Sequence, residues 1–161
     1  MKTILKIFLL SGLIGVLAMS CGKKSNSFDL TNFSHSGCKT GTEAYSINNQ
    51  AQESQGDTET MEIKSENGFW SVKHINAMFN CSPNKLTADA AINGFTIDIN
   101  ENEEGHGANC LCLYDLSYKI GPIAHGKYTV ILNKMGAEYF RFNIDYTTSV
   151  DTTIFIKKTI L

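Results

Sequence analysis

The sequence predicts an all-β fold, an antiparallel β-sandwich with roughly seven or eight strands. Asn-Gly dipeptides at 67–68 and 93–94 each separate two segments in which apolar and polar residues alternate, which is the pattern of β-hairpins. Glycine is frequent, with 13 residues, and proline is rare, with 2. No segment shows a sustained helical repeat. With 161 residues, 42% of them hydrophobic, the chain is long enough for one domain with its own core.

Residues 1–20 have the composition of a signal peptide. Lys2 and Lys6 give a positive start, and an uncharged apolar run follows at 7–19. This run is shorter than the ~20 residues that span a bilayer. We therefore expect 1–20 to be a signal peptide, 21–27 to be the new N-terminus and a tether, and 28–161 to be a single β-sandwich domain.

The segment Leu17-Ala-Met-Ser-Cys21 resembles the lipobox of bacterial lipoproteins. The resemblance implies that Cys21 is lipidated and becomes the first residue after cleavage, and two or more acyl chains anchor a protein stably. With its Asn- and Ser-rich tether and small all-β domain, the chain resembles small lipoproteins of Bacteroidetes. Lys23 and Lys24 stand where surface-displayed members of that group carry acidic residues, which implies a periplasm-facing position at the outer membrane.

The first strands lie on either side of a polar segment. A short strand is expected at 28–34, and a flexible loop is expected near 46–57, where polar residues dominate. The first hairpin joins strands at 60–65 and 69–75 through the Asn-Gly turn at 67–68.

The second hairpin joins strands at 86–92 and 95–99 through the Asn-Gly turn at 93–94. Alternation with period two assigns one face of each strand to the core. The residues expected on that face are Leu86, Ala88, Ala90 and Ile92 in the first strand and Phe95, Ile97 and Ile99 in the second.

The segment 110–120 is apolar on both faces, so we expect it to be the most buried strand, central in its sheet. A third hairpin is expected between 127–132 and 138–147, around 133–136, and a last strand is expected at 152–161. The residues of the third hairpin that we expect to face the core are Phe140, Phe142, Ile144 and Tyr146.

The segment Gly126-Lys-Tyr-Thr-Val130 enters a strand after a bend at Gly121 and Pro122. Tyr128 in this segment resembles the corner tyrosine of immunoglobulin-like domains, whose hydroxyl bonds back to nearby backbone. The resemblance implies an immunoglobulin-like β-sandwich. The alternative is a tyrosine that only packs within its strand.

Four cysteines remain besides Cys21: Cys38, Cys81, Cys110 and Cys112. An even number of cysteines in an exported protein predicts disulfides. Cys110 and Cys112 point to the same side of one strand, so we expect each of them to bond one of the other two. The sequence leaves the choice of partner open, and free buried thiols are a second interpretation.

Metal binding is a further interpretation of these cysteines. Cys81, Cys110, Cys112 and His74 could converge on a tetrahedral zinc, although a C-x-C pair alone is a weak signal. The ordinary expectation for His74 is a strand histidine with satisfied hydrogen bonds, and no cofactor is predicted.

The acidic segment 98–107 has side-chain oxygens at Asp98, Asn100 and Asn102, a spacing similar to that of calcium loops. It lacks a glycine at the sixth position and a glutamate at the twelfth. We therefore expect a solvated loop between strands.

Enzyme signatures are absent: the sequence has no G-x-S-x-G, no H-E-x-x-H and no phosphate-binding glycine loop. A cysteine nucleophile with His74, His106 or His125 is a thiol-enzyme hypothesis. The paired carboxylates Glu103 and Glu104 lie in the expected loop, without an apolar pocket around them. We predict that the protein is not an enzyme.

Charge and aromatic residues bear on the partners. Without Lys2 and Lys6 the chain keeps 14 − 2 = 12 basic residues against 16 acidic ones, with no basic patch for nucleic acid. Phe69, Trp70 and Tyr139 could form an exposed platform for sugars or could pack in the core.

The sequence thus predicts a lipid-anchored, non-enzymatic binding or envelope-assembly module for a protein or glycan ligand, with a zinc-binding lipoprotein as the alternative.

Overall fold

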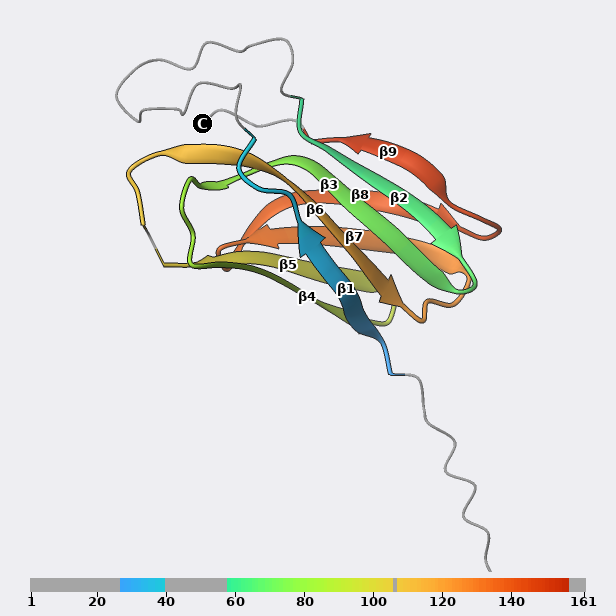
Figure 1. Ribbon diagram of the computed structural model, residues 1–161. Coiled ribbons are helices and arrows are strands. Elements are labelled where there is room, and N and C mark those ends of the chain that lie inside the picture. The colour runs from blue at the N-terminus through green and yellow to red at the C-terminus, as the bar shows by residue number, and fades with distance from the viewer. Residues whose placement is uncertain (1–26, 40–57, 106, 157–161) are drawn as a thin grey trace, which may run out of the picture.

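The computed structural model describes residues 27–39, 58–105 and 107–156. These residues form a β-sandwich, as predicted, and contain strands but no helix (Figure 1). The described residues contain nine strands, where we expected seven or eight. They are β1 (Asp29–His35), β2 (Thr60–Glu66), β3 (Phe69–Asn80), β4 (Lys85–Asn93), β5 (Thr96–Glu104), β6 (Leu111–Gly121), β7 (Gly126–Lys134), β8 (Ala137–Tyr146) and β9 (Asp151–Phe155). The predicted signal peptide, Cys21 and the loop expected near 46–57 lie outside the described residues.

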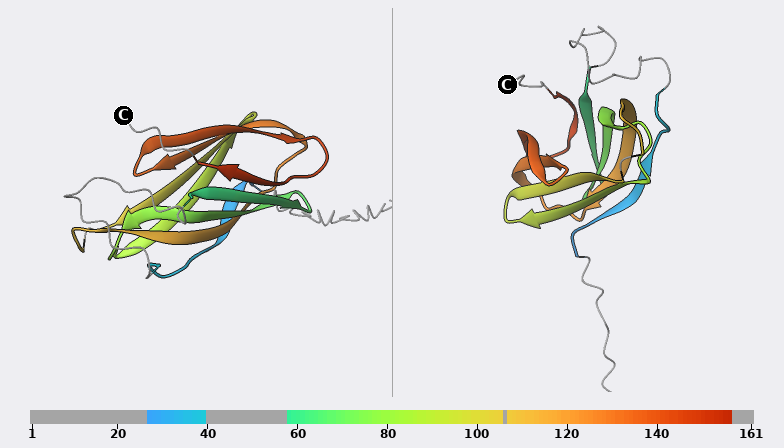
Figure 2. Two further views of the ribbon diagram at one scale, coloured as in Figure 1. Left: turned by 90° about the horizontal axis from the view of Figure 1, so that it is seen from above. Right: turned by 90° about the vertical axis from the view of Figure 1, so that its left-hand side faces the viewer.

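The strands form two sheets that pack face to face (Figures 1 and 2). One sheet has five strands in the order β1-β6-β3-β2-β9, and the other has four in the order β4-β5-β7-β8. Neighbouring strands are antiparallel except β5 and β7, which are parallel. The strand order therefore differs from the ABED and CFG sheets of immunoglobulin constant domains. Tyr128 nevertheless makes the predicted corner contact, because its hydroxyl donates to the Ala124 carbonyl at 2.8 Å.

The three predicted hairpins are present, and each is closed by a two-residue turn, at 67–68 as predicted, at 94–95, and at 135–136 within the expected 133–136. Asn67 and Gly68 both have positive φ, as a type I′ turn requires. In the second hairpin the loop is Gly94 and Phe95, one residue later than expected, because Asn93 pairs with Thr96. The prediction for Phe95 was therefore wrong: it lies in the turn and is 65% exposed.

β-Bulges change which residues face the core. Between His74 and Ala77, β3 has one residue more than its partner β6, and Asn76 takes a φ of 60° there. Both His74 and Ala77 are therefore buried, although strict alternation would place them on opposite faces. β8 has a similar bulge. Leu132 of β7 pairs with Phe140 and Asn133 pairs with Glu138, so Tyr139 is the extra residue between them.

The core contains most of the residues that alternation assigned to it. Ile97, Ile99, Ile144 and Tyr146 are buried as predicted, and Phe140 and Phe142 pack against the core from a sheet edge. Trp70 is fully buried and packs edge-on against Tyr128 and Tyr146. The exposed aromatic platform is therefore not formed, since Trp70 belongs to the core.

The sandwich has two ends with different contents. We call "entry end" the end where the described chain begins at Ser27, and it carries the loops 67–68, 94–95, 122–125 and 147–150. Backbone hydrogen bonds tie these loops together, such as Ile123 N–H to Gly68 O at 2.7 Å. We call "disulfide end" the opposite end, with the loops 81–84 and 135–136, residues 107–110 and all four bonded cysteines.

Candidate functional site

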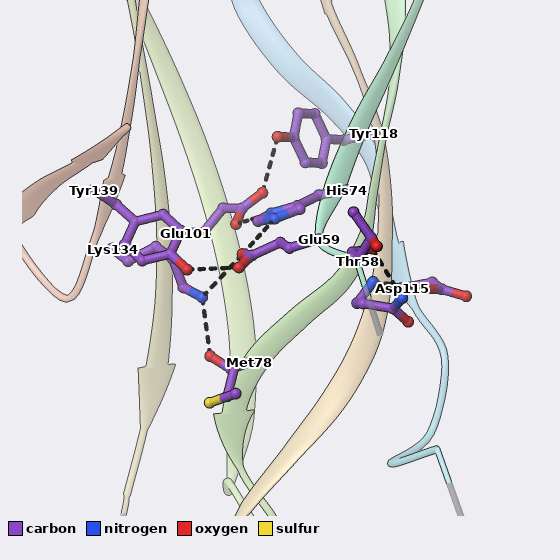
Figure 3. A network of polar contacts seen from close by, with 10 residues as sticks. Thr58, Glu59, His74, Met78, Glu101, Asp115, Tyr118, Lys134 and Tyr139 are labelled. Atoms are coloured by element: carbon purple, nitrogen blue, oxygen red, sulfur yellow. Dashed lines mark hydrogen bonds and ion pairs between the residues drawn. The ribbon is translucent and has the colours of Figure 1, made fainter. Parts of the chain in front are cut away.

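A polar network joins the two sheets near the disulfide end (Figure 3). His74 of β3 is fully buried and donates from Nδ1 to Glu101 Oε2 of β5 at 2.7 Å and from Nε2 to Glu59 Oε1 at 2.8 Å. The second oxygens of both carboxylates also accept hydrogen bonds. Tyr118 donates to Glu101 at 2.9 Å, and Tyr139 donates to Glu59 at 2.6 Å.

Strand alternation and the bulges position these side chains. Glu59 continues the inward face of β2, two residues before Met61, and Glu101 continues the inward face of β5 after Ile99. The bulge in β8 aims Tyr139 into the sandwich, where its hydroxyl reaches Glu59.

Lys134 closes the network toward the surface. Its ammonium donates to the Met78 carbonyl at 2.9 Å and lies 3.8 Å from Glu59 Oε1. It also lies 4.4 Å from the ring centre of Phe79 and 4.5 Å from that of Tyr139, which are cation–π distances. Only 10% of the Lys134 side chain is exposed, so the ammonium and the rings seal this side of the network.

The surroundings keep the network charged. Burial alone would lower the pKa of His74. The charge and hydrogen bonds of Glu101 and Glu59 outweigh this effect and raise the pKa from 6.5 to about 9. Burial raises the pKa of Glu59, but the hydrogen bond from His74 and the charge of Lys134 bring it below its usual value. Burial and Glu101 raise the pKa of Tyr118. Near neutral pH, His74 is therefore an imidazolium and the tyrosine is a hydrogen-bond donor.

This arrangement has the groups of an acid–base site but not its access. Both ring nitrogens of His74 already donate to carboxylates, so the imidazolium has no nitrogen left for a substrate. His74 and Glu101 have 0% exposure and Glu59 has 4%. Such a network fixes the two sheets relative to each other, because its members come from β3, β5, β6, β7 and β8 and from the residue before β2. His74 thus matches the expected strand histidine with satisfied hydrogen bonds.

The cysteines form the two disulfides that the sequence left unassigned. Cys38 bonds Cys112, and Cys81 bonds Cys110. β6 lies between β1 and β3, so each disulfide joins the start of β6 to the end of one neighbouring strand. The expectation that Cys110 and Cys112 each bond one of the other two is confirmed.

The zinc hypothesis requires residues that the structure places in different groups. Cys81 and Cys110 form one disulfide, Cys112 belongs to the other, and His74 lies between two carboxylates. Within the described ranges no three His, Cys, Asp or Glu side chains are grouped as metal ligands.

The acidic segment is a strand where we expected a solvated loop. β5 pairs with β4 along its whole length, and the last pair is Lys85 with Glu104. Asp98, Asn100 and Asn102 lie on the outer face of this strand, and Asn100 donates to Asp89 of β4 at 2.6 Å. Glu103 accepts from the Asn80 backbone N–H at 2.6 Å. The calcium-like spacing thus belongs to the solvent face of β5.

The histidines of the thiol-enzyme hypothesis are not next to a thiol in the described structure. His125 lies at the entry end, where its Nδ1 is 3.0 Å from the Thr147 carbonyl. His106 lies outside the described residues. The four described cysteines are in disulfides, so none of them offers a thiolate in this state.

Sequence reasoning missed the two carboxylates around His74. The signal was present in the alternation of the strands. Glu59 lies two and four residues before Met61 and Ile63, and Glu101 lies two and four residues after Ile99 and Ile97, so each falls on the same face as those buried residues. Extending the alternation beyond the last apolar residue would have placed both on the core face.

Comparison with known proteins finds no matching family model, no matching curated protein and no matching solved structure. In residues 27–39, 58–105 and 107–156 there is no helix with the length and hydropathy of a membrane span.

Proposed function

We propose that this chain is a non-enzymatic lipoprotein of the bacterial cell envelope, anchored through lipid on Cys21. Its β-sandwich acts as a binding or envelope-assembly module for a protein or glycan partner. The proposed location is the periplasm-facing side of the outer membrane.

The pairing of the cysteines carries this proposal. The chain has five cysteines, and the two disulfides use four of them, all within the folded domain. Paired cysteines are typical of exported proteins, since the cytosol keeps thiols reduced. The fifth is Cys21, at the end of the apolar leader and within the lipobox-like segment. An exported domain with one remaining cysteine at that position fits an anchored lipoprotein.

The closed polar network supports a binding role over catalysis. The buried titratable groups of the described core neutralise one another: Glu59 and Glu101 face His74 and Lys134. A catalytic acid or base must lie within hydrogen-bond reach of its substrate. The network instead stiffens a scaffold, and the outer surface and loops of that scaffold are free to take a partner.

Intact mass spectrometry of protein from bacterial membranes tests the anchor. We expect the loss of residues 1–20, the mass of attached acyl chains, and fractionation with the membrane. Cys21→Ser should abolish the lipid mass and the processing, whereas Ser25→Ala, which leaves Cys21 in place, should change neither. An unmodified Cys21 in membrane-extracted protein would refute the anchor.

Thiol titration with metal analysis tests the character of the folded domain. Four blocked thiols that become reactive after reduction, with no bound metal, are expected for the binding module. Four free thiols with one equivalent of zinc would favour the zinc-binding lipoprotein that uses Cys81, Cys110, Cys112 and His74. One reactive thiol would favour the thiol-enzyme hypothesis.

A further inference from the structure

We propose that the entry end of the sandwich rests on the lipid surface and that the exposed ring of Phe95 inserts among the lipid head groups. This inference depends on the proposed anchoring through Cys21. It assigns an orientation: the disulfide end points away from the membrane, toward the partner.

The length of the tether limits which part of the domain can meet the bilayer. Six residues lead from Cys21 to Ser27, and even fully extended they span at most about 22 Å. β6 alone, with 11 residues, is about 37 Å long. A lipid on Cys21 therefore holds the start of β1, and the loops around it, within reach of the head groups.

Phe95 is fixed in the loop layer at this same end. It is 65% exposed, although it belongs to a two-residue turn, where polar residues are usual. Its carbonyl accepts from the Thr129 N–H at 2.9 Å, and its ring centre lies 5.6 Å from that of buried Tyr128. The backbone hydrogen bond and the contact with Tyr128 therefore hold the Phe95 ring in a fixed position. Phe is among the apolar side chains with which peripheral segments enter the boundary between head groups and acyl chains.

The loops around Phe95 can approach a lipid surface at little electrostatic cost. The loops 67–68, 94–95, 122–125 and 147–150 contain no Asp, Glu, Lys or Arg. Bringing charged side chains against a low-dielectric layer would require their desolvation. These four loops can therefore contact head groups without burying a charge of their own, and the nearest charged residues, such as Glu66 and Asp151, belong to the adjoining strands.

Tryptophan quenching in liposomes tests the orientation. The full-length lipidated protein is reconstituted in phosphatidylethanolamine–phosphatidylglycerol vesicles with or without brominated acyl chains. Native Trp70 is fully buried and supplies the baseline. Phe95→Trp probes the entry end, and Phe155→Trp is the matched control, because Phe155 is 60% exposed on the opposite end of the sandwich. We expect brominated lipid to quench the fluorescence of Phe95→Trp several-fold more than that of Phe155→Trp.

The possible results separate failure of the orientation from failure of the anchor. Mass spectrometry of the same samples establishes whether Cys21 carries lipid. With lipid present, equal quenching of both variants, or quenching of Phe155→Trp alone, overturns the orientation and leaves the anchor intact. An absence of lipid on Cys21 overturns both. Circular dichroism of each variant confirms that the sandwich is folded.

Discussion

At the scale of single residues, His74 is the side chain that most depends on its neighbours. It is a buried imidazolium between two buried carboxylates, and Lys134 brings a second positive charge to the rim. Two negative and two positive charges therefore balance within the interior. Replacing such a group by apolar residues is often neutral, but removing one member leaves an uncompensated charge.

We expect His74→Ala to lower the free energy of unfolding by roughly 3–5 kcal/mol, because Glu59 and Glu101 lose the cation between them. Urea unfolding followed by circular dichroism measures the change. Lys64→Ala is the control: its ion pair with Asp151, at 3.2 Å, is largely exposed, and such pairs contribute about 0–1 kcal/mol. Equal effects of the two substitutions would contradict a charged buried network.

The stability of the protein should fall at alkaline pH. The pKa of His74 is about 9 in the folded protein against 6.5 in an unfolded chain. A raised pKa means that the stabilisation is complete below pH 6.5 and is lost as the pH rises through 9. The loss should be of the order of 3 kcal/mol, at 1.36 kcal/mol per pKa unit.

Urea unfolding at pH 6, 7.5 and 9.5 measures this loss. His125→Ala should show the same decline, because His125 is exposed at the entry end and outside the network. A free energy of unfolding that stays constant from pH 6 to 9.5 would show that His74 does not gain a proton on folding. Below about pH 4.5 a second decline is expected, since the pKa of Glu59 is lowered by folding.

At the scale of elements, β6 is the strand to which its neighbours are covalently fixed. The bond from Cys38 to Cys112 has a sequence separation of 74, and that from Cys81 to Cys110 has one of 29. In the chain-entropy model the longer loop stabilises by about 4.5 kcal/mol and the shorter by about 3.6 kcal/mol.

We therefore expect Cys38→Ala with Cys112→Ala to destabilise the domain more than Cys81→Ala with Cys110→Ala. Cys112 is also buried, so its truncation adds a packing loss to the entropic one. Thermal unfolding of the two double variants and of the wild type gives the order. The reverse order would show that loop entropy does not dominate here.

The end of β6 depends on a glycine. Gly121 has a φ of 147°, and a Cβ there would lie 2.8 Å from Phe69 Cδ1 and 3.0 Å from Gly68 O. We expect Gly121→Ala to cost about 1–3 kcal/mol through backbone strain and this contact. Gly37→Ala is the matched control, since a Cβ at Gly37 has no atom within 4 Å, and it should stay within about 0.5 kcal/mol of wild type in the same urea titration.

The hairpins were predictable from the sequence because their signals are local. An Asn-Gly turn between alternating segments needs no information from elsewhere in the chain. The bulges have no such signal. The extra residue at Asn76 is set by pairing with β6, about forty residues away, and it decides that Ala77 and Phe79 turn inward.

At the scale of the molecule, the sequence predicted the sandwich but not the arrangement of its strands. The parallel pairing of β5 with β7 joins segments separated by all of β6, and alternation alone cannot specify which strands become neighbours. The buried site was missed for a related reason. Glu59 and Glu101 appear as ordinary polar residues in the sequence, and only the packing of one sheet on the other places both beside His74.

The Cys38–Cys112 disulfide also governs how the domain can be shed from its proposed anchor. A protease cut within 40–57 divides the chain into a piece with Cys21 and β1 and a piece with β2 to β9. The disulfide still joins the two pieces, so cleavage alone does not release the domain. After limited proteolysis in this segment, we expect one band on a non-reducing denaturing gel and two bands after reduction. Two bands without reductant would contradict this. If Cys21 carries the proposed lipid, a cut in this segment therefore frees β2 to β9 from the anchor only when a reductant also opens the Cys38–Cys112 disulfide.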